Sequence, residues 1–414
     1  MGKVILKEDA FVRLPETETV DELLFEAGEE NVDKIHLILP KNFYVDEECA
    51  FSTYKAINSL LETVPSINKL IICDLGILHG GHYDYKKELD CEKFFYKNYR
   101  RIEQPEKVFF QKNSGFFHSR YDNAMSFSRD DFSLSHCKNI DDKISLFIND
   151  IKDSNLSSFE KIMATYILCS RFIDSSTEDN EKNIYSSVFN ILSDGDDGYQ
   201  IHCVGYTDLF CRMLDKMDIN AIPLFVFNNE KGFAHSAALV DVCDESYEIN
   251  GSFICDVRGE SDFRQSLEEG FLTHLSNTDN YYGEDRLRYF CLNCDDYESI
   301  TTLDKFNTPI LYTAKELGKV DEKNLISKER IPLEKIGKAL IETSIFRFGV
   351  DVETFKNDNG NNTIRDDFLD TFNNLIYSRN KADYFNYVYN NELEHMFTDT
   401  KTDSVKVAND VKKP

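Results

Sequence analysis

The sequence contains no tryptophan and is short of basic residues. It has 47 Lys and Arg against 74 Asp and Glu, which gives a formal net charge of −27. A surface of that charge repels phosphate backbones and anionic lipids, so we expect neither nucleic acid nor a membrane as a partner. A basic or neutral polypeptide partner fits better. Because there is no tryptophan, the aromatic side chains available for packing are 32 Phe and 21 Tyr.

Long apolar runs are also missing, and no stretch is long enough to span a bilayer. The opening MGKVILKEDAFVRL has a short apolar run broken by charges, unlike a signal peptide. Leu6 stands where a myristoylation motif has Ser or Thr. The 11 cysteines lie mostly in apolar settings, typical of reduced, buried thiols. We therefore expect a cytoplasmic protein.

The sequence offers little support for a cofactor or a metal. It has no Gly-rich phosphate loop, so a nucleotide site is not expected. Cys291 and Cys294 have the spacing of a zinc or redox pair, but only one such pair exists and zinc sites normally need two. His79 and His82 could supply half of a metal site, yet a glycine loop after a strand explains them as well.

The chain has 414 residues, is 41% hydrophobic and shows no internal repeat, which favours two or three packed domains. In the N-terminal part, the patterns predict a strand at 34–39, a helix at 50–64 and a strand at 70–75, an order typical of a parallel α/β unit. The predicted organisation is an α/β unit at 1–100, a connector at 101–140, a second domain at 141–315, a helical region at 325–398 and a flexible tail at 399–414.

The second domain carries the most informative residues. Cys203 begins an amphipathic helix, where unpaired N–H groups and the helix dipole favour a thiolate. His235 follows in the second strand of a predicted hairpin, and Asn250 follows at the end of the next strand. Each residue alone has an ordinary structural explanation: a buried thiol, a packing histidine, a turn. Their order supplies a nucleophile, a base and an orienting group for thiol chemistry.

Three further residues could take part in this site. Asp256 is an alternative to Asn250 as the orienting group if the strand register differs, but the longer interval from His235 favours Asn250. Gln200 could donate a hydrogen bond to an oxyanion, and His202 could tune the pKa of its neighbour Cys203.

The motifs resemble those of transglutaminase-like proteins of the bacterial type. Cys203-Val-Gly-Tyr-Thr-Asp-Leu-Phe resembles the family's Cys-x-Gly-Tyr-Ala-x-Leu-Phe signature, Phe159-Glu-Lys-Ile its upstream helix, and Ala234-His235 its histidine motif. Tyr247-Glu-Ile-Asn250 resembles its aromatic-x-Val-Asp motif, with Asn where the family usually has Asp. The resemblance covers roughly residues 141–265.

The resemblance implies an α+β class with a papain-like core, in which the cysteine helix packs on an antiparallel sheet. It implies a cysteine protease, deamidase or transglutaminase that forms a thioester acyl-enzyme, with Cys203, His235 and Asn250 as catalytic residues, no cofactor, and a polypeptide or amide substrate. The alternative is an inactive relative that serves as a binding or scaffold protein, because fold and activity can separate. The sequence identifies neither the acyl acceptor nor the oligomeric state.

Overall fold

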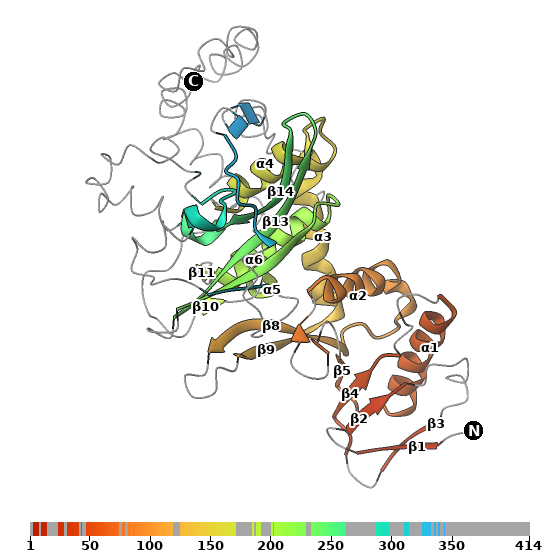
Figure 1. The fold of residues 1–414 in the computed structure, drawn as a ribbon. Coiled ribbons are helices and arrows are strands. Elements are labelled where there is room, and N and C mark those ends of the chain that lie inside the picture. The colour runs from red at the N-terminus through yellow and green to blue at the C-terminus, as the bar shows by residue number, and fades with distance from the viewer. Residues whose placement is uncertain are drawn as a thin grey trace, which may run out of the picture. The chain divides into compact units, whose positions relative to one another are not determined.

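The structure is a computed structural model. It describes residues 3–7, 10–14, 24–28, 31–40, 43, 47–73, 77–78, 82–83, 85–118, 125–170, 184–185, 188–191, 200–201, 203–228, 233–261, 287, 289–297, 310–313, 325–332, 335–336, 338–339 and 343. The chain is a mixed α and β protein with several sheets (Figure 1), as the predicted α+β class requires. It divides into two compact units, one of residues 1–142 and 314–320, the other of 143–313 and 321–414.

A five-stranded sheet organises the first unit. The strand order is β2-β4-β5-β8-β9, parallel except for the antiparallel pair β8–β9. Two smaller pairs accompany it, β1 with β3 in parallel and β6 with β7 in antiparallel order. The bounds are β1 Lys3–Leu6, β2 Ala10–Arg13, β3 Leu24–Ala27, β4 Lys34–Ile38, β5 Lys69–Cys73, β6 Ile77–Leu78, β7 His82–Tyr83, β8 Val108–His118 and β9 Met125–Ser133.

Helices α1 (Glu47–Thr63) and α2 (Tyr85–Lys97) lie beside this sheet (Figure 1), and a short 3₁₀ helix follows at Tyr99–Arg101. Aromatic side chains join the layers. The ring of Phe95 on α2 lies 5.3 Å from Phe110 on β8 and 5.6 Å from Tyr54 on α1. The predicted strand, helix and parallel strand are thus confirmed as β4, α1 and β5.

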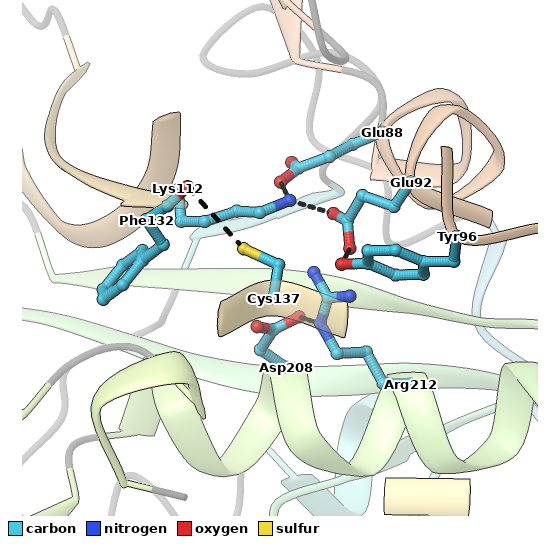
Figure 2. A network of polar contacts seen from close by, with 8 residues as sticks. All are labelled: Glu88, Glu92, Tyr96, Lys112, Phe132, Cys137, Asp208 and Arg212. Atoms are coloured by element: carbon cyan, nitrogen blue, oxygen red, sulfur yellow. Dashed lines mark hydrogen bonds and ion pairs between the residues drawn. The ribbon is translucent and has the colours of Figure 1, made fainter. Parts of the chain in front are cut away.

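A buried charge network crosses from β8 to α2. The Lys112 ammonium donates to Glu88 at 3.3 Å and also contacts Glu92 (Figure 2). All three side chains are nearly inaccessible to solvent. Tyr96 donates to the other oxygen of Glu92 at 3.0 Å. Because a buried charge is tolerated only when it is paired and hydrogen-bonded, this network fixes the register of α2 against β8.

The prediction that residues 101–140 form a connector is wrong. They are not a connector: they carry β8, β9 and the first part of α3, and β9 closes one edge of the five-stranded sheet. The polar run Gln111-Lys-Asn-Ser within β8 hides the strand in the sequence, although Lys112 is buried like Val108 and Phe110. The boundary between the two units falls within α3 (Leu134–Lys152).

The second unit is built on an antiparallel sheet of order β14-β13-β12-β15. The bounds are β12 Ala221–Asn228, β13 Phe233–Asp244, β14 Ile249–Cys255 and β15 Ile310–Thr313, and a separate parallel pair joins β10 (Ile184–Tyr185) to β11 (Gln200–Ile201). Helices α4 (Ser158–Ser170) and α6 (Cys203–Asp215) contact each other and strand β13, and α5 (Val188–Ile191) contacts α6 (Figure 1).

A capping box begins α4, with Ser157 and Glu160 as its two partners. The Ser157 N–H donates to the Glu160 carboxylate at 2.7 Å, and the Glu160 N–H donates back to the Ser157 hydroxyl at 3.4 Å. Tyr166 and Phe159 from this helix are fully buried, and Phe290 packs against both rings. On α6, Asp208 and Arg212 form an ion pair at 2.8 Å, also drawn in Figure 2.

The turn that joins β13 to β14 is held by Asp244. One carboxylate oxygen accepts the Phe159 N–H at the start of α4 at 2.8 Å. The other accepts the Ser246 N–H at 3.0 Å and its hydroxyl at 2.6 Å. Burial alone would raise the pKa of Asp244, but the hydrogen bonds from Ser157, Ser246 and Phe159 hold it below its usual range. The carboxylate thereby fixes where β14 begins.

We expect Asp244→Ala to lower the free energy of unfolding by about 1–2 kcal/mol at pH 7, because it removes a helix-capping acceptor. The folded pKa of Asp244 is depressed, so its contribution is complete above the unfolded pKa of about 3.9 and is lost as pH falls through the folded value. Urea denaturation at pH 7, 5 and 3.5 tests this. Glu245→Ala, an exposed change in the same turn, is the control. A deficit that persists unchanged at pH 3.5 would contradict the assignment.

The start of the predicted C-terminal helical region is described and belongs to the second unit. The N–H groups of Lys335 and Ile336 donate to the Pro332 carbonyl, as in the first turn of a helix. Residues 344–398 and the predicted tail at 399–414 lie outside the described residues. Within the described part of the chain, no helix is both long enough and apolar enough to cross a bilayer.

Candidate active site

Cys203 is the first residue of α6, as the sequence predicts. The helix buries an apolar face that includes Tyr206, Leu209 and Phe210, while Cys203 itself is only half-buried. The thiol therefore lies at the end of a helix whose free N–H groups favour negative charge, and it remains reachable. These are the conditions under which a cysteine becomes a nucleophile.

The register of α6 on β13 brings Cys203 and His235 together. Thr207, one helical turn after Cys203, donates its hydroxyl to the carbonyl of Ser236 at 3.1 Å. Ser236 follows His235 directly, and its backbone N–H is a hydrogen-bond partner of the Cys203 sulfur. The Cys203 and His235 side chains are themselves hydrogen-bonded to each other. The two predicted residues thus meet at one point.

The acid that holds the imidazole is Asp256. Nε2 of His235 lies 2.7 Å from Oδ2 of Asp256, and because an ionised carboxylate only accepts, Nε2–H is the donor. The other ring nitrogen is then left for the sulfur. The His235 side chain is 14% exposed and that of Asp256 only 3%, so the ion pair is largely shielded from solvent.

Asp256 is itself firmly held. It follows the last residue of β14 and begins a short helical segment at 257–261, whose Gly259 N–H donates to Oδ1 at 2.8 Å. The buried hydroxyl of Tyr297 donates to Oδ2 at 3.0 Å. The backbone N–H of Asp256 donates to the Tyr289 carbonyl at 3.0 Å, and the Tyr166 hydroxyl donates to the carbonyl of Asp256 at 3.2 Å. The carboxylate has little freedom to rotate.

The choice of Asn250 as the orienting group is wrong. Asn250 is exposed near the start of β14 and pairs with Cys243 on β13, eight residues from His235 and so about 26 Å away along the strand. The chain turns at 245–248, where Glu248 has a φ of 51°, and Asn250-Gly251 lies within the returning strand. Strand β14 runs back toward His235, so its end carries Asp256 to the ring.

The charges of the three groups reinforce one another. Burial alone would raise the pKa of Cys203, but the hydrogen bond and charge of His235, the charge of Arg258 and the Ser236 N–H lower it. Burial alone would lower the pKa of His235, but Asp256 and Cys203 raise it well above its usual range. The pKa of Asp256 is lowered against the effect of burial, first by the charge of His235. The arrangement favours a thiolate beside an imidazolium.

Gly259 leaves room for the acid. A Cβ at this position would lie 3.0 Å from both Cγ and Oδ2 of Asp256. We expect Gly259→Ala to displace the carboxylate and slow alkylation of Cys203 at pH 6 by at least about fivefold. Because alanine favours a helix over glycine by about 0.5–1 kcal/mol, this loss should come without a matching loss of stability.

Alkylation rates by mass spectrometry and thermal melting check this prediction together. Gly251→Ala is the matched control, since its Cβ would crowd Ser327 and Phe253 instead of Asp256. Unchanged Cys203 reactivity in Gly259→Ala would show that Asp256 tolerates the added methyl group.

The remaining sequence candidates are not part of this cluster as described. His202 and His79 lie outside the described residues, and of Gln200 and His82 only the strand backbone is described. The Cys291 sulfur contacts Cys255 at 3.6 Å. Among the described residues, no group of three or more His, Cys, Asp and Glu side chains could hold a metal ion.

Three residues that position or charge the site were not predicted from the sequence. Tyr297 is 41 residues from Asp256 and has no local signal that points to it. Arg258 and Gly259 follow Asp256 directly, and only an Asp at the start of a helical segment hints at a cap there. No protein-family model matches the sequence, and no curated protein matches it, so the resemblance of its motifs to a known family stays a prediction.

Proposed function

We propose that this chain is a cysteine-dependent acyl-transfer enzyme of the transglutaminase-like type. The observation that carries the proposal is the chain of contacts from Cys203 at the start of α6, through His235 on β13, to Asp256 after β14. A nucleophile, a base and an acid that orients the base, arriving from a helix and two adjacent antiparallel strands, form the arrangement that thiol acyl transfer needs. In this proposal the second unit has the family's papain-like fold.

In the first half of the reaction, the Cys203 thiolate attacks an amide carbonyl. The sulfur–carbon bond forms, and the carbonyl π electrons move to oxygen. When the tetrahedral intermediate collapses, the imidazolium of His235 gives its proton to the leaving amine, and a thioester remains on Cys203. Asp256 stabilises the imidazolium and fixes the ring through Nε2, so the other nitrogen faces the reacting atoms.

In the second half, neutral His235 removes a proton from the acceptor as the acceptor attacks the thioester, and the carbon–sulfur bond breaks to return the Cys203 thiolate beside the imidazolium. Water as the acceptor gives hydrolysis or deamidation, and a primary amine gives transfer. The substrate is a polypeptide or another amide, and the net charge of −27 favours a basic or neutral one. The residues described for the site supply the nucleophile, the base and the orienting acid of this mechanism.

The test is covalent trapping. Full-length protein is incubated with peptide-like probes that carry an aldehyde or a vinyl sulfone in place of the amide, and the intact mass is measured. We expect one adduct, located on Cys203, that is lost in Cys203→Ala and strongly slowed in His235→Ala. Cys243→Ala is the matched control, because it removes an exposed thiol of the same unit and should leave trapping intact.

Equal labelling of Cys203 and of the exposed Cys243, or an adduct that survives Cys203→Ala, would overturn the proposal. That result, together with unchanged folding and partner binding in Cys203→Ala, would favour the alternative of an inactive binding or scaffold protein.

A further inference from the structure

Two cysteines outside the proposed mechanism lie in contact beside the site. Cys255 is the last residue of β14, and Cys291 lies 36 residues later, next to Phe290. Their sulfur atoms are 3.6 Å apart, and both side chains are buried. Neither residue takes part in the contacts that hold the thiol, the imidazole or the acid.

The backbone places these two thiols for bonding. Ile254 and Leu292 form an antiparallel bridge in which each N–H donates to the other's carbonyl at 2.8 Å. Cys255 and Cys291 directly adjoin this bridge, and the chain turns at Cys291, which has a φ of 49°. Because the two sulfur atoms are 3.6 Å apart and a disulfide bond is about 2.05 Å long, they need to approach each other by only about 1.5 Å to bond.

We propose that Cys255 and Cys291 are a site of reversible disulfide formation next to the acid of the active site. Asp256 follows Cys255 directly, its N–H donates to the Tyr289 carbonyl, and Tyr297 donates to its carboxylate. A bond from Cys255 to Cys291 ties the strand that delivers Asp256 to the segment at 289–297 that anchors it. Its effect on the reactivity of Cys203 rests on the proposed function, whereas formation of the bond does not.

The oxidant that we propose is a hydroperoxide. One thiolate attacks the peroxide, the O–O bond breaks, and a sulfenic acid forms together with water or an alcohol. The second sulfur then attacks the sulfenic sulfur and displaces water, so that two thiols lose two electrons and two protons to the peroxide. Burial, followed by the hydrogen bond and charge of Cys255, raises the pKa of Cys291.

Disulfide mapping tests this proposal. Full-length Cys203→Ala protein, which lacks the competing nucleophile, is treated with hydrogen peroxide, alkylated under denaturing conditions and digested. We expect a peptide pair joined through Cys255 and Cys291, reversed by dithiothreitol, with fragmentation spectra separating Cys291 from Cys294. The melting temperature should rise by about 5 °C or more on oxidation. In Cys203→Ala with Cys291→Ser, neither change should occur.

Recovery of Cys255 and Cys291 as free thiols, as separate sulfinic acids or in bonds to other cysteines would overturn the inference. Buried Cys169, which contacts Met213, is an internal reference that should stay reduced. Wild-type protein with Cys203 alkylated beforehand should give the same linked peptides. If the link forms but Cys203 never shows a thiolate, the proposed function fails and the disulfide site stands; if Cys203 is reactive but no link forms, the reverse holds.

Discussion

Asp256→Asn should slow alkylation of Cys203 by about a hundredfold at pH 6. The asparagine keeps the shape of the side chain and one oxygen for the Gly259 N–H, while an NH₂ group takes the place of Oδ2, which accepts from His235 and Tyr297. It removes the negative charge that stabilises the imidazolium of His235. Burial then favours a neutral imidazole, the thiolate loses its positive neighbour, and each unit by which the pKa of Cys203 rises costs about a factor of ten in thiolate below that pKa.

The control for this change is Asn250→Ala, because Asn250 is the residue that motif spacing favours. Asn250 is exposed and pairs with Cys243, so its loss should leave Cys203 as reactive as in the wild type. Rates of iodoacetamide labelling, resolved for each cysteine by mass spectrometry, measure both variants. A loss of reactivity in Asn250→Ala with none in Asp256→Asn would reverse the assignment of the acid.

The second large effect is expected from His235→Ala. The change removes the hydrogen bond and the charge that lower the pKa of Cys203, and leaves the burial that raises it. With the thiol pKa at or above its free value of about 8.5, the thiolate fraction at pH 6 falls to a fraction of a percent, so labelling should slow by a few hundredfold. Added imidazole should restore part of the rate, because the change opens a space for a small base.

His136→Ala serves as the comparison for this variant, since His136 lies on α3 and its ring stacks on Phe132. Labelling of Cys203 should be unchanged in it. If His235→Ala keeps its wild-type rate at pH 6, the thiolate does not depend on the imidazole, and His235 has another role.

The sequence predicts the local elements of the site well. The three- and four-residue spacing of Tyr206, Leu209, Phe210 and Met213 predicts α6, and the Ser157–Glu160 capping box predicts the start of α4. Both patterns involve residues that are close together along the chain, so they can be recognised without knowledge of the tertiary structure.

The register of β14 could not be predicted in this way. Asn-Gly is a strong turn signal, yet the turn forms four residues earlier, where Asp244 binds the start of α4 and Ser246. A contact 85 residues apart along the chain therefore decides which residue reaches His235. The role of Tyr297 could not be predicted for the same reason, because its contact with Asp256 spans 41 residues.

The thiolate–imidazolium pair is tested most directly by the alkylation rate of Cys203 from pH 4 to 9, resolved from the other ten cysteines. Because the pKa of Cys203 is lowered and that of His235 is raised, we predict fast labelling that is already established below pH 7, with a further step where the imidazolium loses its proton. A single titration near pH 8.5, shared with the exposed Cys243, would contradict the thiolate–imidazolium pair and with it the proposed acyl-transfer chemistry.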